Sequence, residues 1–169
     1  MSDYENALAP FTVTVVTGGS SGMGKTFISL LAEANPRMAF CNLSRRAPTG
    51  LPAGVEKRLL HVACDLGKAD RRAEAMGEAE RFIRRDHYRS KVLLINNSGF
   101  GSCGNFTGAE CAGQLDMVQV NVAAVVELTA RLLPVLRERG GAVINVASLA
   151  GFQPTPYMAT YGASKAFLL

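Results

Sequence analysis

The chain has 169 residues, of which 48% are hydrophobic and 19% are charged, and its formal net charge at pH 7 is +4. This length and composition predict one soluble globular domain, residues 1–169, with a sizeable core. The basic residues are scattered among acidic ones, and no uninterrupted apolar run is long enough to cross a bilayer. Nucleic-acid binding and a membrane span are therefore both disfavoured.

The N-terminal residues lack the basic and apolar regions of a signal peptide, and we expect a cytoplasmic protein. An apolar, β-branched run over residues 11–16 then predicts a buried strand, and residues 26–33 have helical spacing. The turn between them has the pattern G-x-x-x-G-x-G. Gly18 and Gly22 can adopt positive φ there, and the N–H groups that begin the helix can bind an anion.

A buried strand, a glycine turn and a helix start, in that order, form the phosphate-binding corner of a dinucleotide fold. Gly24 would let the helix pack closely on its strand. A purely structural turn is the alternative interpretation. In the dinucleotide interpretation, the cofactor-binding residues of this corner are Thr17, Gly18, Ser20, Ser21, Gly22, Met23 and Gly24.

Strand and helix patterns alternate along the rest of the chain. Further strands are predicted over residues 37–43, 58–64, 91–96 and 142–147. Further helices are predicted over residues 68–87, over 109–139 with Pro134 as a candidate kink, and from about residue 157 onward. Residues 47–54 contain too many Pro and Gly for a crossover helix, and residues 97–108 are predicted to form a loop. Repeated β-α-β units predict a doubly wound parallel sheet.

Four cysteines lack the C-x-x-C spacing of a metal site, and no metal is expected. Cys41 and Cys64 stand in apolar runs and are predicted to be small core residues. His61 lies in a predicted strand and His87 near the end of a predicted helix. Core or surface roles are favoured for both over catalysis.

Tyr161 and Lys165 are four residues apart in the last predicted helix, so both side chains lie on one face. An ammonium close to a phenol favours the phenolate and lowers the pKa of the phenol. Tyr161 is then a usable general acid or base. A chance occurrence of this spacing is common, but here it follows the fifth predicted strand, with Ser148 at the end of that strand.

Several motifs occur together and in one order, namely Thr17-Gly18-x-x-x-Gly22-x-Gly24, Asp65-Leu66, Asn96-Asn97-Ser98-Gly99, Asn121, Ser148 and Tyr161-x-x-x-Lys165. In this combination the chain resembles the short-chain dehydrogenases/reductases over essentially its whole length. Residues 97–106 and 147–157 further resemble the branch that includes ketoacyl- and ketosteroid-type reductases. The resemblance implies an NAD(P)-dependent oxidoreductase that transfers a hydride between a nicotinamide cofactor and a carbonyl or alcohol.

The resemblance also implies four catalytic residues. Tyr161 would donate the proton to a carbonyl oxygen or take it from an alcohol. Tyr161 and Lys165 would also bind the cofactor, Lys165 by holding the nicotinamide ribose. Ser148 would hydrogen-bond the substrate oxygen as charge develops. Asn121 would hold a water that links Lys165 to bulk solvent, although a capping or kinking polar residue is the alternative. Tyr157 has no Lys four residues later and would line the substrate pocket.

Further cofactor contacts follow from the same resemblance. Asp65, followed by Leu66, would accept a hydrogen bond from the adenine amino group. Asn97 and Gly99 would shape the wall beside the ribose, and Ser98 stands between them where the family usually has Ala.

The end of the second predicted strand bears on the choice between NAD(H) and NADP(H). NAD enzymes usually place a carboxylate there, whereas an Arg accommodates a 2′-phosphate. This chain has no carboxylate at that place. Arg45 can clamp the phosphate through charge-assisted bonds, and Ser44 can add a hydrogen bond. NADP(H) is therefore predicted over NAD(H), and Arg46 is either a second contact or a surface charge.

The chain ends four residues after Lys165, so we expect it to lack the family's last strands and its substrate-covering loop. Five strands, in the predicted order 3-2-1-4-5, would leave the fifth as an edge. Two alternatives to an enzyme remain open: a non-catalytic nucleotide-binding or interaction fragment, and a structural subunit. The substrate is predicted to be a small apolar carbonyl or alcohol, and a full-length form is expected to be a homo-oligomer. Candidate lining residues are Phe100, Phe106, Phe152 and Tyr157.

Overall fold

The computed structural model describes residues 3–85, 90–106 and 111–169. Its centre is an all-parallel sheet whose strands lie in the order β3-β2-β1-β4-β5, which confirms the predicted doubly wound topology. The strands are β1 (Phe11–Thr17), β2 (Ala39–Ser44), β3 (Leu59–Ala63), β4 (Lys91–Asn96) and β5 (Ala142–Asn145). The strand β5 is one edge of this sheet, and Val143 and Ile144 on it are exposed.

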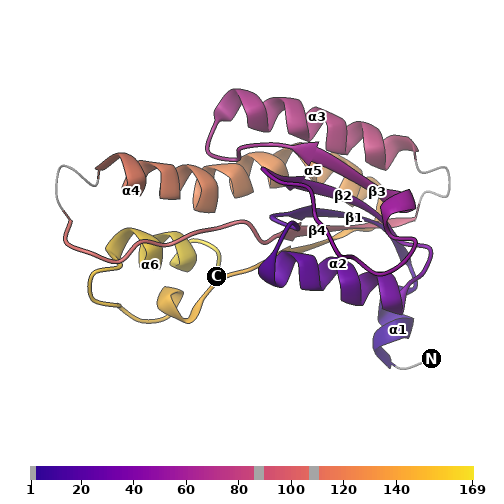
Figure 1. The fold of residues 1–169 in the computed structure, drawn as a ribbon, viewed down its shortest axis with the longest axis horizontal. Coiled ribbons are helices and arrows are strands. Elements are labelled where there is room, and N and C mark those ends of the chain that lie inside the picture. The colour runs from indigo at the N-terminus through magenta and orange to yellow at the C-terminus, as the bar shows by residue number, and fades with distance from the viewer. Residues whose placement is uncertain (1–2, 86–89, 107–110) are drawn as a thin grey trace.

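Helices cover both faces of the sheet (Figure 1). One face carries α2 (Gly22–Ala34), with the short helix α1 (Asp3–Leu8) against its end. The other face carries α3 (Ala69–Arg85) and α5 (Ala124–Arg139). Between β2 and β3 the chain forms one 3-10 turn, η1 (Glu56–Arg58), which agrees with the loop predicted for residues 47–54.

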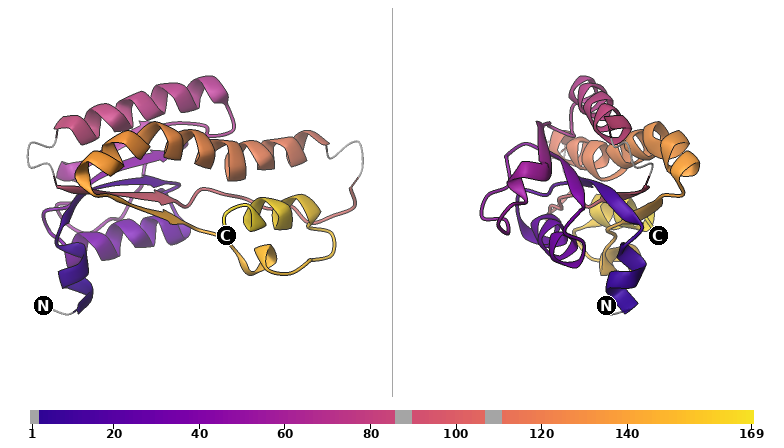
Figure 2. Two further views of the ribbon diagram at one scale, coloured as in Figure 1. Left: turned by 180° about the vertical axis from the view of Figure 1, so that it is seen from behind. Right: turned by 90° about the vertical axis from the view of Figure 1, so that its right-hand side faces the viewer.

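The long helix continues past the sheet toward the C-terminal segment. Its sections are α4 (Cys111–Val118), the π-helical turn η3 (Gln119–Ala123) and α5. Beside α4 lies α6 (Ala159–Ala166), preceded by the 3-10 turn η4 (Leu149–Gly151). The left view in Figure 2 shows this pair of helices beyond the carboxyl ends of the strands. The fold therefore places Tyr161 and Lys165 at the edge where ligands of such sheets bind.

Two apolar cores follow from alternation along the strands. Val13 and Val15 of β1 pack with α3 and α5, whereas Val16 packs on the other face with Ile28 of α2. Successive side chains of a strand point to opposite faces, and both faces here are covered, which explains the nearly continuous apolar runs. Cys41 and Cys64 belong to the first core, as predicted.

The predicted helix boundaries differ from the structure in three places. The long helix contains an unpredicted π-helical turn at η3, whereas Pro134, the candidate kink, lies within α5. The last helix begins at Ala159 instead of near Tyr157, because Tyr157 has a φ of +61°, outside the helical region. The helix α1 was not predicted. His87, residues 107–110 and the predicted end of the helix over 68–87 lie outside the described residues.

Within the described residues one helix, Cys111–Arg139, is long and apolar enough to cross a membrane, judged by length and composition alone. Its most apolar window has a mean hydropathy of 1.4, and 33% of that window is buried. Leu128, Leu132 and Leu136 of this helix lie in the core against the sheet. A core helix of a folded domain has the same length and composition, so the property is weak support for a span.

Candidate active site

The glycine turn between β1 and α2 has the backbone geometry predicted for it. Gly18 and Gly22 have φ angles of +71° and +52°. A Cβ added at Gly24 would lie 2.3 Å from the Gly18 carbonyl oxygen, so only glycine allows this approach of α2 to the turn. The helix begins at Gly22, directly after the turn, and its first N–H groups are available to an anion.

Thr17 and Asn97 join the carboxyl ends of β1 and β4. The Thr17 hydroxyl oxygen accepts from the backbone N–H groups of Asn97 and Ser98, at 3.0 and 2.9 Å. The Asn97 side-chain amide donates to the Thr17 carbonyl oxygen at 2.9 Å. These bonds fix the wall formed by residues 97–99 against the glycine turn. Through these bonds, Thr17 and Asn97 hold in place the backbone segments that form the site.

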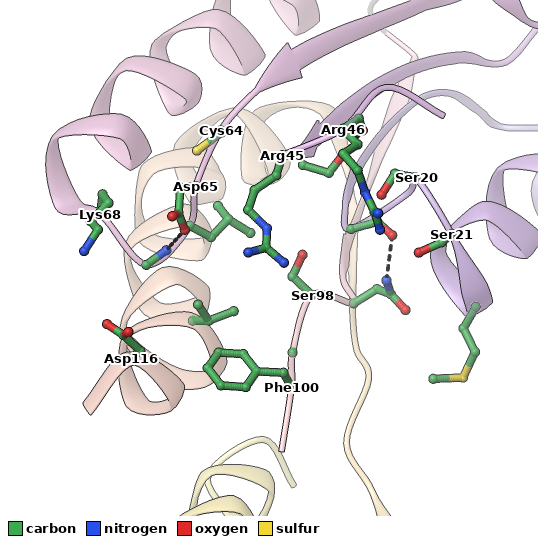
Figure 3. Close-up of a pocket in the computed structure, with 18 residues that line it drawn as sticks. Ser20, Ser21, Arg45, Arg46, Cys64, Asp65, Lys68, Ser98, Phe100 and Asp116 are labelled. Atoms are coloured by element: carbon green, nitrogen blue, oxygen red, sulfur yellow. Dashed lines mark hydrogen bonds between the residues drawn. The ribbon is translucent and has the colours of Figure 1, made fainter. Parts of the chain in front are cut away.

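A cavity of about 660 Å³ opens at this edge of the sheet, in front of β1 to β4 (Figure 3). Its lining includes most of the predicted cofactor residues, namely Gly18, Ser20, Ser21, Met23, Ser44, Arg45, Asp65, Leu66, Asn97, Ser98 and Gly99. Residues that were not predicted as cofactor contacts also line it, namely Arg46, Cys64, Gly67, Lys68, Phe100, Asp116 and Val120. Of the predicted residues, Thr17, Gly22 and Gly24 do not line the cavity and belong to the turn behind it.

Basic side chains reach into the cavity from the end of β2. Figure 3 shows the Arg45 guanidinium between Asp65 and Ser98, and Arg46 beside Ser20. Ser44 also lines the cavity, but its hydroxyl donates to the Arg46 carbonyl oxygen at 2.8 Å, and the residue is buried. The hydroxyl proton is thereby used within the protein, and the phosphate contact of Ser44 stays a prediction.

The loop that carries Asp65 is held from behind by a buried arginine that the sequence analysis missed. Asp65 itself accepts from the backbone N–H of Gly67 at 2.9 Å. Arg72 of α3 donates to the Leu66 carbonyl oxygen at 2.8 Å and to Gln119 Oε1 at 3.1 Å. It also forms a two-point ion pair with Glu127, at 2.9 and 2.8 Å.

The Arg72–Glu127 pair is unequally buried, with side-chain exposures of 2% and 43%. Its hydrogen bonds hold the pKa of the Glu127 carboxyl below its ordinary value. Through Arg72 the loop after β3 is tied to the turn η3 and to α5. No spacing rule links these residues, which are far apart in the sequence.

Three of the predicted catalytic residues meet along residues 99–101, which follow β4. A Cβ added at Gly99 would lie 3.2 Å from both Asn121 Oδ1 and Lys165 Nζ, and one added at Gly101 would touch the Tyr161 ring at 2.8 Å. Gly99 also lines the cavity, so the cavity wall leads directly to these side chains. The Lys165 ammonium lies 5.9 Å from the centre of the Tyr161 ring.

Lys165 is buried, and its ammonium donates to the Val146 carbonyl oxygen at 2.7 Å. Burial lowers the pKa of Lys165, because the charged form loses water.

Asn121 lies in η3 and is fully buried. Its amide donates to the Phe100 carbonyl oxygen and to Ser164 Oγ, both at 2.9 Å, and its oxygen accepts from the Phe100 N–H at 3.1 Å. Ser164 was not singled out in the sequence, although it precedes Lys165 directly. The predicted water contact of Asn121 stays a prediction.

Ser148 follows β5 and caps η4 by accepting from the Ala150 N–H at 3.3 Å. The turn η4 packs directly on α6: a Cβ at Gly151 would lie 2.9 Å from the Lys165 carbonyl oxygen. Ser148, Tyr161 and Lys165 are thus carried by two packed elements. None of the three lines the cavity, so they form a second, adjoining part of the site.

A parallel sheet with a glycine turn before a helix N-terminus, and a cavity at its carboxyl edge, defines a dinucleotide-binding α/β protein. The family model described as short chain dehydrogenase matches residues 12–169. The chain belongs to this short-chain dehydrogenase family.

Individual relatives agree with this assignment. The chain is 29% identical to hydroxysteroid dehydrogenase-like protein 1 of Gallus gallus, over 91% of this chain and 47% of that protein. It is 27% identical to a 3-beta-hydroxysteroid dehydrogenase of Comamonas testosteroni, over 91% and 59%. Among solved structures, a short-chain dehydrogenase from Sphingobium yanoikuyae in complex with NADPH superposes with a TM-score of 0.78 at 27% identity, covering 94% of this chain and 61% of that one.

The chain spans about half the length of the curated relatives that it matches, between 47% and 59% for these two. The names of the relatives are consistent with the ketoacyl- and ketosteroid-type branch that the sequence resembles.

Proposed function

We propose that this chain carries the cofactor-binding and catalytic residues of an NADP(H)-dependent oxidoreductase that interconverts a carbonyl and an alcohol. One observation carries the proposal: Asn121, Lys165 and Tyr161 gather around residues 99–101, directly beyond the cavity wall that residues 97–99 form. A protein that only bound a nucleotide would not need an acid–base pair at that place.

The residues of the cavity fit a dinucleotide. The glycine turn and the start of α2 would hold the diphosphate, and Asp65 and Leu66 would contact the adenine. The bound nicotinamide would supply or accept the hydride. NADP(H) is proposed over NAD(H) because Arg45 and Arg46 line the cavity at the end of β2, where no carboxylate stands.

The chain's own residues would move and stabilise the proton. Tyr161 Oη would donate it to the carbonyl oxygen in reduction, or accept it from the alcohol in oxidation. The buried Lys165 ammonium would stabilise the phenolate form of Tyr161. Ser148 would hydrogen-bond the substrate oxygen, and Asn121 would keep residues 99–100 in place.

The proposed substrate is an apolar carbonyl compound or alcohol. The turn η4 and the helix α6 form the reaction end of the site, and large apolar side chains around it are exposed. The exposures are 80% for Leu149, 73% for Phe152 and 74% for Phe106. Relatives named for hydroxysteroids and for very-long-chain 3-oxoacyl-CoA support this class, because the steroid ring system and the long acyl chain are apolar.

The cofactor assignment is tested with Arg45→Asp. We expect the ratio of the NADH and NADPH dissociation constants to change by at least about 30-fold in favour of NADH, because a charge-assisted bond to phosphate is lost and a repulsion is added. Fluorescence titration with each cofactor gives the ratio. Arg37→Asp, the same charge change at another exposed site, is the control and should leave the ratio unchanged. An unchanged ratio for Arg45→Asp would contradict the NADP(H) assignment.

Turnover is tested separately on a panel of ketones with NADPH. NADPH consumption that depends on an apolar ketone supports the enzymatic proposal. Tight NADPH binding without turnover on any ketone or alcohol would instead support the non-catalytic nucleotide-binding alternative.

A further inference from the structure

Asn42 is a fully buried amide in the middle of β2, on the sheet face covered by α2. Apolar side chains lie beside it on that face: Phe40 lies two residues earlier, and Ile28 of α2 packs in the same core. A buried amide costs free energy unless all its hydrogen-bonding groups are paired. An amide at such a position therefore calls for a physical explanation.

The partners of Asn42 define the orientation of its amide. The backbone N–H of Gly19, which can only donate, lies 2.8 Å from Asn42 Oδ1. The Nδ2 group must then point the other way, where it meets Ser44 Oγ at 2.8 Å and His61 Nδ1 at 3.2 Å. Nδ2 can only donate, so His61 Nδ1 is the acceptor of this contact. Both hydrogens and the oxygen of the Asn42 amide are paired.

These bonds continue to the turn that carries the basic residues. Ser44 Oγ accepts from Asn42 and passes its own hydrogen to the Arg46 carbonyl oxygen at 2.8 Å. A chain of three hydrogen bonds thus runs from Gly19 through Asn42 and Ser44 to Arg46. One end is the glycine turn predicted to hold the diphosphate, and the other end is the turn from which Arg45 reaches into the cavity (Figure 3).

The fit at the Gly19 end is close. A Cβ added at Gly19 would lie 2.6 Å from Asn42 Oδ1 and 2.6 Å from Ile28 Cδ1. The turn therefore rests directly on the Asn42 amide, and a shift of one turn is passed to the other through short, buried bonds. Buried bonds of this kind are stronger than solvated ones and hold geometry well.

We propose that Asn42 and Ser44 are positioning residues that set the cofactor preference of this protein, by fixing the Arg45–Arg46 turn at a defined distance from the diphosphate turn. The inference rests on the proposed function, in which Arg45 meets the 2′-phosphate. The two residues touch no cofactor atom in this role. Their effect is that the guanidinium groups are already in place when the diphosphate binds, which lowers the cost of binding the 2′-phosphate.

The test compares NADPH and NADH dissociation constants for Ser44→Ala and Asn42→Leu. Ser44→Ala breaks the bond to Arg46 and leaves the contact between Gly19 and Asn42. We expect NADPH binding to weaken by about fivefold, the equivalent of one lost hydrogen bond, and NADH binding by less than about twofold. Asn42→Leu also frees the Gly19 N–H, so binding of both cofactors weakens, and NADPH binding weakens more.

Thr14→Val is the matched control. Thr14 is also a buried polar residue of a central strand, and its hydroxyl donates to Met38 Sδ at 3.0 Å, away from both turns. We expect this variant to lower the melting temperature without changing the ratio of the two dissociation constants. A change of ratio shared by Thr14→Val would show that any loss of core polarity has this effect, and the inference would be wrong.

Arg45→Asp, measured in parallel, separates failure of the inference from failure of the proposed function. If Arg45→Asp changes the ratio and Ser44→Ala weakens NADPH and NADH equally, the positioning role is wrong and the NADP(H) assignment stands. If Arg45→Asp leaves the ratio unchanged, the assignment is wrong and the inference falls with it. Should Asn42→Leu fail to fold, Ser44→Ala decides alone.

Discussion

The cofactor end of the site is enclosed by the carboxyl ends of β1 to β4 and is braced by buried hydrogen bonds, such as those of Thr17 and Asn42. The reaction end instead consists of η4 and α6, outside the sheet, with exposed apolar side chains such as Phe152 around it. The first end is a cavity whose walls are shaped by the backbone. The second is an open surface on which a few side chains are positioned.

In the proposed function, most cofactor contacts and the acid–base chemistry therefore depend on separate parts of the chain, with Lys165 serving both. Residues 99–101 and the long helix, whose turn η3 carries Asn121, connect the two parts. A substitution in one end should leave the other largely intact, whereas a substitution in the connection should affect both. Substitutions at each end of the site and in the connection test that separation.

Tyr161→Phe should give the largest effect. Removing the proton donor is expected to lower kcat by about 10³-fold, within the range of general acid–base catalysis. The NADPH dissociation constant should change by less than about twofold, because Tyr161 does not line the cavity. Steady-state turnover and fluorescence titration measure the two quantities. Equal loss of binding and turnover would contradict the separation.

Glu127→Ala should come next, because it breaks the connection. It leaves the Arg72 cation buried without its carboxylate, and we expect a loss of stability of about 3 kcal/mol. Arg72→Met should cost less, about 2 kcal/mol, since the half-exposed Glu127 regains water. Thermal melting checks the order, and a larger loss for Arg72→Met would contradict it. Both variants should also weaken NADPH binding, because Arg72 holds the Leu66 carbonyl.

The same pair predicts an acid dependence. The pKa of Glu127 is lowered in the folded protein, so its stabilising contribution is complete above the ordinary glutamate pKa of about 4.3 and is lost as the pH falls through the lowered value. Denaturant unfolding of the wild type and Glu127→Gln, followed from pH 6 to pH 3, should show curves that converge in acid. Parallel curves over this range would be inconsistent with the pair.

Gly24→Ala should disturb only the cofactor end. The added Cβ would meet the Gly18 carbonyl oxygen at 2.3 Å, and the turn must shift, at a cost of about 2 kcal/mol. We expect NADPH binding to weaken by about tenfold or more. Gly113→Ala is the control, since nothing lies within 4 Å of a Cβ there. A control that weakened binding as much would rule out the close approach as the cause.

Phe152→Ser should give the smallest effect, and only at the reaction end. Loss of part of an apolar contact is expected to lower kcat/KM for a bulky apolar ketone by about fivefold, with NADPH binding unchanged. Leu30→Ser, which removes an exposed apolar side chain from α2, is the control. If a small polar ketone were affected equally, Phe152 would have no role in substrate binding.

The sequence was informative where the chemistry depends on local spacing. Gly18 and Gly22 have the positive φ angles predicted for them, and the strand order follows from the alternation of elements. The spacing of Tyr161 and Lys165 also predicted that both lie on one helix. That helix lies beside residues 99–101, which continue the cavity wall.

The sequence was uninformative where contacts join distant segments. From the sequence alone, Arg72 is one of many charged residues expected at the surface. Only the packing of α3 on α5 shows that it is buried. The contact of Ser44 with the Arg46 carbonyl could not be foreseen, because Ser44 also suits a phosphate contact. Asn42 could be singled out in the sequence, because it is the one amide within the apolar run of β2.

The π-helical turn η3 adds one residue to the repeat of the long helix. A helix without that residue would be regular, and everything before it would be turned by about 100° about the helix axis. Asp116 of α4 would then be turned away from its place in the cavity lining, and a different flank of α4 would face α6. Deleting one residue here would therefore rotate α4 about the helix axis. The extra residue of η3 thus keeps the outer wall of the cavity aligned with the reaction end.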